Sequence, residues 1–366
     1  MRTYDVAIVG GGPAGGACAR ALELAGAHAV LLERERLPRD KPCAGWVTPA
    51  VFEALELSPQ DYACDGRTLQ PFTAFATSVM GDSAIRTEFP GVVSYGIRRC
   101  EFDTLILRAL RTPVLEATPL VTMRREGGRW ILNDSITAPI VVGAGGHFCP
   151  VARQVARATP RRAVLARGIE LRLAPGEPCA VDGRVPELYF CRDLEGYGWC
   201  IRKGDYLNVG IGRRRGEAFR SHVATFASFL RASGRVPARA TDWRHWRGHA
   251  YTLASDGATA IDDGVVLIGD AAGLAARESG EGIAPAIESA LAATVTIVEA
   301  AGDYDRGHLQ PYADWVRNRA SVNGIGASLR AHVPAVVGRR LMGSPSFARM
   351  VVERGFLGRP SPRVIA

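Results

Sequence analysis

Three glycines near the start of the chain have the spacing of a nucleotide-binding turn. Gly10, Gly12 and Gly15 form the pattern G-x-G-x-x-G, and Glu33 follows at the end of the next apolar run. In such a turn the first glycine bends the chain, the second lets the backbone approach a pyrophosphate, and the third lets a helix pack on a strand. An acidic residue at this distance binds the hydroxyls of an adenosine ribose. The pattern therefore predicts a dinucleotide site.

The elements that would position these residues follow from the flanking sequence. Residues 4–9 are an apolar, β-branched run that is typical of a buried parallel strand. Residues 14–25 are compatible with a helix, whose N-terminus would carry about half a positive charge toward the phosphates. A second strand over 29–32 leads into Glu33. An acid there disfavours a 2′-phosphate and therefore NADP, whereas FAD and NAD both remain open at this point.

A second segment, residues 264–293, favours FAD. Its sequence, GVVLIGDAAGLAARESGEGIAPAIESALAA, predicts a buried strand that ends at Gly269–Asp270 and a helix that begins near Gly282. Asp270 would reach a ribityl hydroxyl, and the backbone N–H groups of residues 280–283 would point at the pyrimidine edge of a flavin. That edge becomes anionic on reduction, and a helix N-terminus stabilises such a charge.

Together the two segments resemble the FAD-binding fold of the para-hydroxybenzoate hydroxylase type. Residues 98–107, RRCEFDTLIL, are similar to the R-x-x-F-D segment of that family, which implies that Arg99 contacts the FAD. Residues 138–153 are similar to the strand that closes the adenine side. Gly145 stands there where the family usually has Asp, so it has no side chain to make the family's usual polar contact.

A nearer resemblance is to geranylgeranyl reductases and their relatives. Residues 41–49, KPCAGWVTP, are similar to the K-P-C-G-G segment of that family, with Ala44 in place of a glycine. Residues 196–212, GYGWCIRKGDYLNVGIG, are similar to its G-Y-G-W-x-F-P-K-G-D-x-x-N-V-G-x-G segment, with Arg202 in place of proline. The resemblance covers approximately residues 3–320.

The resemblance also suggests which residues carry chemistry. In that family the loop after the second strand approaches the flavin ring, so the thiol of Cys43 could act in proton transfer. The alternative is a buried thiol that packs as a small apolar group. Lys41 could bind a cofactor phosphate or be solvated. We expect the FAD to contact Gly10, Gly12, Pro13, Ala14, Gly15, Glu33, Arg34, Lys41, Cys43, Ala44, Arg99, Gly145, Gly269, Asp270, Gly280, Gly282 and Ile283.

A substrate pocket is expected on the face of the flavin, lined by Trp46, Tyr197, Trp199 and Arg277. Tyr197 and Trp199 lie two residues apart in a predicted strand, so their side chains would face the same way. The alternative is that these aromatic residues belong to the core. Arg277 replaces the proline of the family's P-x-[ST]-G-E-G-I, and a charge there could change the substrate or the electron donor. The cysteines and histidines show no metal-binding spacing, so we expect no metal.

The expected fold class is α/β. A Rossmann-like FAD-binding domain would be interleaved with an antiparallel-sheet substrate domain and followed by a short helical C-terminal tail. Alternating segments between residues 161 and 249 indicate antiparallel strands. Helices are predicted over 215–233 and 307–332. The predicted limits are 1–60, 95–160 and 250–320 for the FAD-binding domain, 61–94 and 161–249 for the substrate domain, and 321–366 for the C-terminal segment.

Three functions stay open on this reasoning. The resemblance implies an FAD-dependent reductase of C=C bonds in an apolar, isoprenoid-like substrate, by hydride transfer from reduced flavin. A second possibility is an FAD-dependent monooxygenase that uses a flavin C4a-hydroperoxide on a small apolar or aromatic substrate. A third is a non-catalytic flavoprotein that carries electrons. The sequence has no second nucleotide fingerprint, so NADH or NADPH would bind transiently, or a redox partner protein would supply the electrons.

Composition and charge complete the expectations. The chain has 366 residues, 47% hydrophobic and 22% charged, and its apolar runs fall short of a membrane span, so we expect a cytoplasmic protein. The formal net charge is +8, and basic residues are concentrated after Val316. This tail could contact an anionic membrane surface weakly, as a peripheral protein does, or pack as a lid over the substrate. No motif supports nucleic-acid binding.

Overall fold

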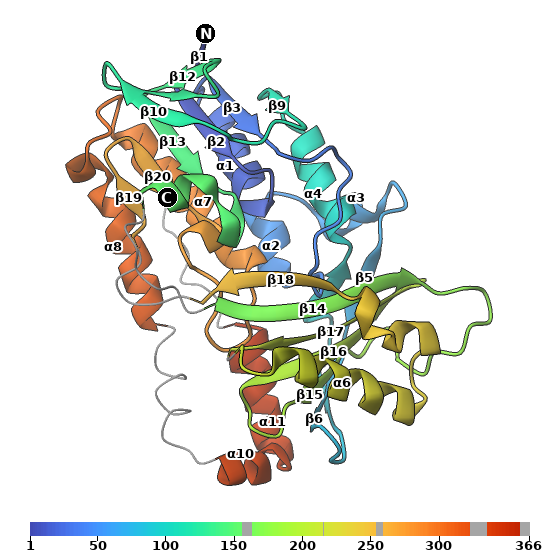
Figure 1. The fold of residues 1–366 in the computed structure, drawn as a ribbon. Coiled ribbons are helices and arrows are strands. Elements are labelled where there is room, and N and C mark those ends of the chain that lie inside the picture. Colours follow the sequence, from blue (N-terminus) through green and yellow to red (C-terminus); the bar gives the residue numbers. More distant parts are fainter. Residues whose placement is uncertain (156–162, 215, 254–258, 323–334, 359–366) are drawn as a thin grey trace.

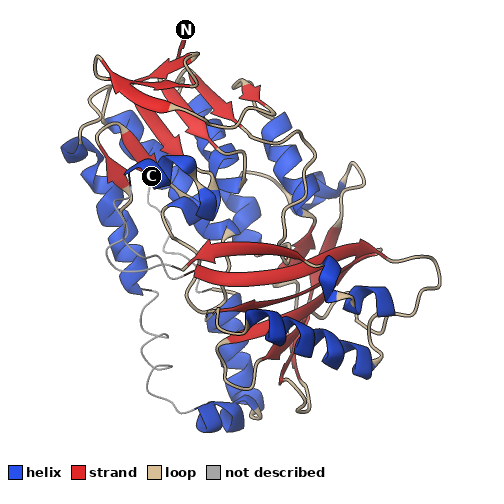
Figure 2. Cartoon of the chain, viewed as in Figure 1, coloured by secondary structure: helices blue, strands red, loops and turns tan. Residues whose placement is uncertain are grey.

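The structure, a computed structural model, describes residues 1–155, 163–214, 216–253, 259–322 and 335–358. A mostly parallel sheet with helices against it forms one part, and a large sheet of mainly antiparallel strands forms the other (Figure 1). Figure 2 shows the helices and strands of both parts in the same view. The helical elements are α1 (Pro13–Leu24), α2 (Pro49–Ala54), α3 (Pro59–Ala63), α4 (Arg99–Arg108), η1 (Gly146–Phe148), α5 (Pro150–Val155), α6 (Phe219–Ser233), η2 (Ala238–Thr241), η3 (Trp243–His245), η4 (Gly269–Ala271), α7 (Ile283–Glu299), α8 (Arg306–Val322), α10 (Ala335–Met342), α11 (Pro345–Val351) and η5 (Val352–Phe356).

The parallel sheet carries the largest apolar core. Its strands are β2 (Val6–Val9), β3 (Ala29–Leu32), β9 (Val114–Leu115), β13 (Ile140–Gly143), β19 (Ile261–Asp262) and β20 (Val265–Leu267). They lie in the order β19-β20-β13-β2-β3-β9, and only β19 runs antiparallel to its neighbour. Every residue of β2, β3 and β13 is buried, as expected for strands covered on both faces. Helices α1 and α7 pack against each other beside this sheet.

Two smaller sheets flank this unit. One has the order β1-β12-β11-β10, and the other has the order β4-β8-β5. The second matters for the site, because β4 follows directly on the loop that contains Cys43. The strands are β1 (Arg2–Thr3), β10 (Met123–Glu126), β11 (Arg129–Leu132), β12 (Ile136–Ala138), β4 (Trp46–Val47), β5 (Leu69–Phe72) and β8 (Ser94–Ile97).

The seven-stranded sheet buries different side chains on its two faces. Its strands are β6 (Ala74–Val79), β7 (Ile85–Glu88), β14 (Ala163–Arg172), β15 (Glu187–Phe190), β16 (Gly196–Lys203), β17 (Tyr206–Arg213) and β18 (Arg247–Thr252), in the order β18-β14-β17-β16-β15-β6-β7. Phe226 of α6 packs on one face, where a Cβ on Gly198 would lie 2.3 Å from its ring. Trp199 and Ile201 belong to a cluster on the other face, together with Val352 and Phe356 of η5.

These observations confirm the expected α/β fold class with its antiparallel sheet and helical C-terminal tail. The helix predicted over 215–233 begins only at Phe219, because Ala218 has a left-handed φ of 51°. The helix predicted over 307–332 is α8 up to Val322, and residues 323–332 lie outside the described residues. The predicted domain limits remain a prediction. In the described part of the chain, no helix combines the length and apolarity that crossing a membrane requires.

Candidate functional site

The glycine turn joins β2 to α1 and leaves its helix end open. Gly10 has φ of +114°, and a Cβ there would lie 2.6 Å from the carbonyl oxygen of Ala144. A Cβ on Gly15 would lie 1.9 Å from the carbonyl oxygen of Gly10, so strand and helix touch at this point. Gly12 is the N-cap of α1, and nothing lies within 4 Å of the place where its Cβ would stand. A pyrophosphate could therefore approach the N–H groups of this helix end, which begins at Pro13.

Glu33 is buried at the end of β3 and accepts hydrogen bonds from the turn. Its Oε2 accepts from the backbone N–H of Gly11 at 2.8 Å, and its Oε1 accepts from that of Glu35 at 3.0 Å. Arg39 Nη2 lies 3.3 Å from the same Oε2. Arg39 also pairs with Asp103 at 3.1 Å and was not predicted from sequence. Arg34, by contrast, is exposed and pairs with Glu35 on the surface.

Arg99 links α4 to the loop of Cys43. Its guanidinium makes two hydrogen bonds of 2.8 Å to the carboxylate of Asp103 and also reaches the thiol of Cys43. Although burial opposes its charge, Asp103 raises the pKa of Arg99. Cys43 is half-buried, and its Sγ accepts a hydrogen bond of 3.3 Å from the backbone N–H of Gly45. The thiol therefore faces a permanent cation.

Lys41 adds a second cation to this group. Burial lowers the pKa of Lys41, and the neighbouring Arg99 lowers it further, while Asp270, Asp103 and Cys43 act in the opposite sense. Two cations in a buried place repel each other, and an anion between them would relieve that repulsion. Lys41 is thus placed to meet an anionic group.

The second predicted segment reaches the same place. Gly269, in η4, touches α1, because a Cβ on Gly269 would lie 3.2 Å from the Cβ of Ala14. Asp270 Oδ1 lies 3.2 Å from the place where a Cβ on Gly282 would stand, at the N-cap of α7. Burial raises the pKa of Asp270, while Lys41 and other cations lower it. Ile283 is buried as the first residue of α7.

Gly280 and Gly145 both occupy tight positions. A Cβ on Gly280 would lie 2.3 Å from the hydroxyl of Tyr251, and φ there is +72°. Gly145 lies beside Gly10, and a Cβ on Gly145 would come within 3.0 Å of the Cα of Cys149. Cys149 therefore crowds the place that an aspartate side chain would take, which gives a physical reason for the departure from the family pattern.

The aromatic residues predicted for the pocket gather around the C-terminal tail. Trp46 stacks on Phe356 with ring centroids 5.4 Å apart, and Tyr197 meets the same ring edge-on at 5.2 Å. Trp199 lies 6.2 Å from Tyr197. Ala44 packs against this cluster. Phe356 was not named from sequence as a pocket residue, because only the fold brings the tail to this sheet.

Arg277 is placed in the loop before α7. Its backbone carbonyl accepts a hydrogen bond from Arg214 at 2.5 Å. Two residues later, the carbonyl of Ser279 accepts a hydrogen bond from the hydroxyl of Tyr197. These contacts fix the loop against β16 and the end of β17.

Two further polar groups were not among the site residues predicted from sequence. The Nε2 of His249 is buried and has no hydrogen-bond partner among the described residues. Burial lowers the pKa of His249 to about 3, and Lys41 and Arg99 lower it as well, so its imidazole stays neutral near pH 7. Lys203 is fully buried and pairs with Glu170 at 2.7 Å. A sequence signal existed only for Lys203, as one of two lysines in an arginine-rich chain.

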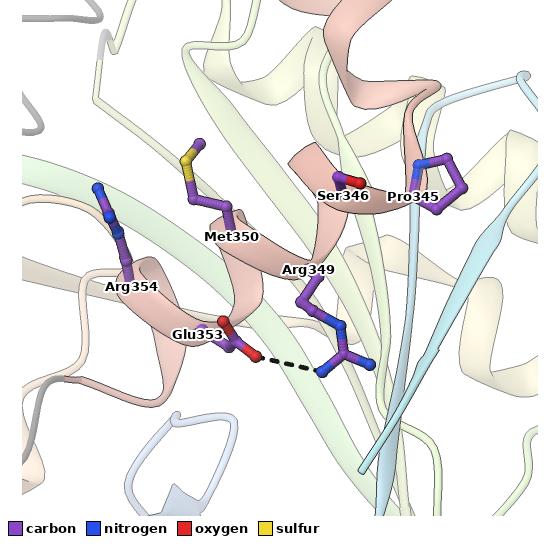
Figure 3. Close-up of a pocket in the computed structure, with 6 residues that line it drawn as sticks. All are labelled: Pro345, Ser346, Arg349, Met350, Glu353 and Arg354. Atoms are coloured by element: carbon purple, nitrogen blue, oxygen red, sulfur yellow. Dashed lines mark hydrogen bonds and ion pairs between the residues drawn. The ribbon is translucent and has the colours of Figure 1, made fainter.

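Two surface pockets lie elsewhere on the described chain. One, of about 750 Å³, lies along α4 and includes Asp40, Arg67, Arg98 and Arg108. The other, of about 390 Å³, lies on α11 and η5 between Pro345 and Arg354, where Arg349 pairs with Glu353 (Figure 3). Neither is lined by the predicted cofactor residues.

These residues fit an FAD. The open helix end at Gly12 suits a pyrophosphate, and the cations Lys41 and Arg99 suit its charge. The unpartnered Nε2 of His249 would gain a hydrogen-bond partner from a polar cofactor. The described residues contain one cluster with metal-ligand spacing, Asp303, Asp305 and His308, which is exposed. Exposed acidic groups of this kind are common without an ion.

Comparison with known proteins agrees with this geometry. Residues 3–58 match the model of an FAD binding domain. The chain is 27% identical over 338 residues to digeranylgeranylglycerophospholipid reductase 3 of Methanosphaera stadtmanae, covering 86% of this chain and 83% of the relative. It is 26% identical to a chloroplastic geranylgeranyl diphosphate reductase of Nicotiana tabacum, covering 81% of this chain and 67% of the relative.

Solved structures share the fold. A geranylgeranyl bacteriochlorophyll reductase-like protein of Thermoplasma acidophilum has a TM-score of 0.76 at 18% identity, with 97% of both chains covered. PqsL of Pseudomonas aeruginosa has a TM-score of 0.70 at 19% identity, with 96% of this chain and all of the other covered. At these identities the likeness concerns the fold alone, whereas the sequence relatives are named as reductases. The chain is therefore an FAD-dependent oxidoreductase, and it is similar to geranylgeranyl reductases, as its motifs predict.

Proposed function

We propose that the chain reduces C=C bonds of an apolar, isoprenoid-like substrate. The observation that carries this proposal is the place of Cys43, whose thiol faces Arg99 while the next residues of its loop join an aromatic wall. A thiol beside an apolar surface suits proton delivery to a carbon atom. Bound FAD, once reduced, supplies the hydride that such a reaction needs.

The residues around the glycine turn would hold the cofactor. The open N-terminus of α1 would bind the pyrophosphate, with Lys41 and Arg99 offsetting its charge. Glu33 would accept hydrogen bonds from the adenosine ribose. Asp270 would bind a ribityl hydroxyl, and the N-terminus of α7 would face the pyrimidine edge of the flavin.

Cys43 would act as the general acid. Its proton would pass to the substrate carbon, and the guanidinium of Arg99 would then stabilise the thiolate that remains. The bond from Asn208 to the carbonyl of Cys43 would keep this loop in place during the transfer. The structural alternative is that Cys43 only packs the loop.

The substrate class follows from the wall beside this thiol. Trp46 and Tyr197 are half-buried aromatic side chains that pack on the buried ring of Phe356, and an aromatic wall of this kind suits a long hydrocarbon chain. The relatives are named for geranylgeranyl substrates, and this supports the same class here. Arg277, at the loop before α7, could select a polar head group.

The electrons would come from transiently bound NADH or NADPH or from a redox partner protein. We also propose that the tail makes weak contact with an anionic membrane surface, where such substrates reside. Val336, Val337 and Leu341 of α10 are exposed, and Arg340 lies among them. This arrangement supports peripheral rather than integral association.

Substitution of Cys43 tests this function. Cys43→Ser should keep FAD bound but slow the substrate-dependent oxidation of the reduced protein by about 10²–10⁴-fold, the usual size of general acid catalysis. The exposed Cys64 provides the control, because Cys64→Ser should leave the rate unchanged. Equal rates for both variants would place Cys43 in a structural role. Reduction by NADH, NADPH and dithionite in parallel identifies the donor.

A monooxygenase is the second candidate, because a solved neighbour at TM-score 0.69 is described as a probable FAD-dependent monooxygenase. The two functions differ in what oxygen does. If the reduced protein converts substrate only when oxygen is present and the product gains oxygen, the monooxygenase assignment replaces the reductase. If no added substrate speeds the oxidation of the reduced protein, with or without oxygen, the chain is better described as an electron carrier.

A further inference from the structure

Glu281 occupies the helix end that is expected to face the flavin. Its Oε1 accepts a hydrogen bond of 2.7 Å from the backbone N–H of Ala284, in the first turn of α7. Gly282, the N-cap residue, has no side chain that could do this. Asp270 Oδ1 lies 3.2 Å from the place where a Cβ on Gly282 would stand. The Glu281 carboxyl and the pyrimidine edge of the flavin would therefore both face the N-terminus of α7.

The surroundings of Glu281 leave it close to its titration point near neutral pH. Burial raises the pKa of Glu281 to about 7, against the opposing effect of the amides of Ala284 and Ile283. Glu288, farther along α7, raises this pKa, and Arg319 of α8 lowers it. Arg319 is already paired with Glu288.

The elements packed against the loop contribute further groups. From β16, the hydroxyl of Tyr197 donates to the carbonyl of Ser279, and Tyr197 and Glu281 interact electrostatically. Arg214, which follows β17, donates a hydrogen bond to the carbonyl of Arg277, and its positive charge lowers the pKa of Tyr197 against the larger effect of burial. The Glu281 carboxyl is bonded by the backbone amides of Ala284 and Ile283.

We propose that Glu281 binds a proton when two electrons enter the FAD site and releases it when they leave. This inference rests on the proposed function, because it assumes that the N-terminus of α7 faces the flavin. The electrons come from a two-electron reductant such as NADH, NADPH or dithionite. One O–H bond forms at the carboxylate for each electron pair, no bond of the protein breaks, and the proton comes from solvent.

The physical reason is competition for the helix end. The partial positive charge at the N-terminus of α7 favours the negative charge that reduction brings to the pyrimidine edge. An ionised Glu281 bonded to the same amides would repel that charge, whereas a protonated Glu281 would not. Reduction should therefore raise the pKa of Glu281. At a pH above the pKa that Glu281 has in the oxidised protein, its carboxyl is ionised before reduction and protonated after it.

The midpoint potential of the bound FAD, measured against pH, tests this coupling. Each proton taken up with the electrons changes the equilibrium constant tenfold per pH unit, which for a two-electron couple is about 30 mV per pH unit. In the native protein the slope should steepen by that amount above about pH 7. In Glu281→Gln, which keeps an acceptor for Ala284, the steepening should be absent.

Glu278→Gln is the matched control, since Glu278 is a carboxylate of the same loop, three residues earlier. It should keep the native slope. A native slope that does not steepen, or equal slopes in the native protein and Glu281→Gln, would overturn the proposal. If Glu281→Gln does not retain FAD, the slope of the native protein is the test, and a native slope that does not steepen overturns the proposal.

The potential requires no substrate, so this result is separate from the test of the reaction. If the native protein binds no FAD, the proposed function itself is contradicted. If the FAD-loaded protein has the same slope of midpoint potential against pH with and without Glu281, only the proton coupling is contradicted.

Discussion

Asn208 Nδ2 lies 2.9 Å from the carbonyl oxygen of Cys43, so β17 of the large sheet holds the loop that carries the proposed acid. The same amide accepts a hydrogen bond of 2.8 Å from the indole of Trp199 through its Oδ1. It also approaches Glu170 at 3.2 Å. One buried side chain thus ties the cofactor loop, the aromatic wall and an ion pair together.

Asn208→Ala should destabilise the protein through these contacts. It leaves the carbonyl of Cys43 and the indole of Trp199 without their partner, at about 1–3 kcal/mol for each buried group left unsatisfied. Urea unfolding of the FAD-loaded protein measures the loss. Asn318→Ala, at an exposed position of α8, should stay within about 0.5 kcal/mol of the native value. Equal stability of the two variants would mean that this amide is not a structural link.

Glu33→Ala should weaken FAD binding. The change removes a buried carboxylate that would bind the ribose, worth about 1–3 kcal/mol, or roughly 5-fold to 150-fold in the dissociation constant. Titration of FAD into the apoprotein gives this constant. Glu35→Ala is the matched control, because the Glu35 side chain pairs with Arg34 on the surface. Unchanged affinity in Glu33→Ala would remove the ribose assignment.

Glu170 predicts a loss of stability in acid. Burial alone would raise the pKa of Glu170, but Lys203, Asn208 and Arg98 lower it below its ordinary value. A lowered pKa means that the ionised form stabilises the fold above the unfolded-state pKa, and that this contribution disappears as the pH falls through the folded-state pKa. The native protein should therefore lose stability as the pH falls below the ordinary pKa of a glutamate, about 4.3.

Glu170→Gln should be less stable at neutral pH, because Lys203 is left buried without its charge partner, at about 3–5 kcal/mol. Its stability should then change less between pH 7 and acid, as urea unfolding at several pH values would show. Glu126→Gln, at an exposed position, should keep the native pH profile. A Glu170→Gln profile parallel to the native one would contradict the assignment.

The tail predicts salt-sensitive binding to anionic vesicles. Val336 is 67% exposed on α10, and Arg339 and Arg340 lie on the same short helix. Each basic residue near an anionic surface contributes about 1 kcal/mol, so changing both arginines to glutamine should weaken binding roughly 30-fold. Cosedimentation at low and high salt measures it. Deleting the tail would be a poor test, because Val352 and Phe356 belong to the core.

Arg124 and Arg125, changed together to glutamine on β10, are the control pair. They should leave vesicle binding almost unchanged. Absence of binding at low salt in the native protein would leave the tail as a lid over the aromatic wall.

The cofactor side of the molecule was predictable because its signals are local. The G-x-G-x-x-G turn, the strand before it and Glu33 lie close together in sequence, and their geometry follows from sterics that few residues other than glycine permit. The start of α7 at Ile283 next to a glycine N-cap is a signal of the same kind. Such patterns need no knowledge of distant contacts.

The polar links across the site could not be predicted, because distant segments supply the partners. Lys203 lies at the hairpin turn between β16 and β17, and its side chain is buried against Glu170 and the carbonyl of Ile97. Arg39 pairs with Asp103 only because α4 packs beside the loop after β3. The pairing of β18 with β14 places His249 opposite Ala166, where Lys41 and Arg99 are close enough to lower its pKa.

The most direct test of the central claim is a single turnover without oxygen. FAD-loaded protein, reduced with dithionite and freed of excess reductant, is mixed anaerobically with geranylgeranyl diphosphate, and flavin absorbance and the mass of the product are followed together. The account predicts that the flavin reoxidises and that one product molecule gains two hydrogen atoms for each flavin oxidised. Flavin that stays reduced until oxygen is admitted, with a product that has gained oxygen or with no change in the isoprenoid, would contradict it.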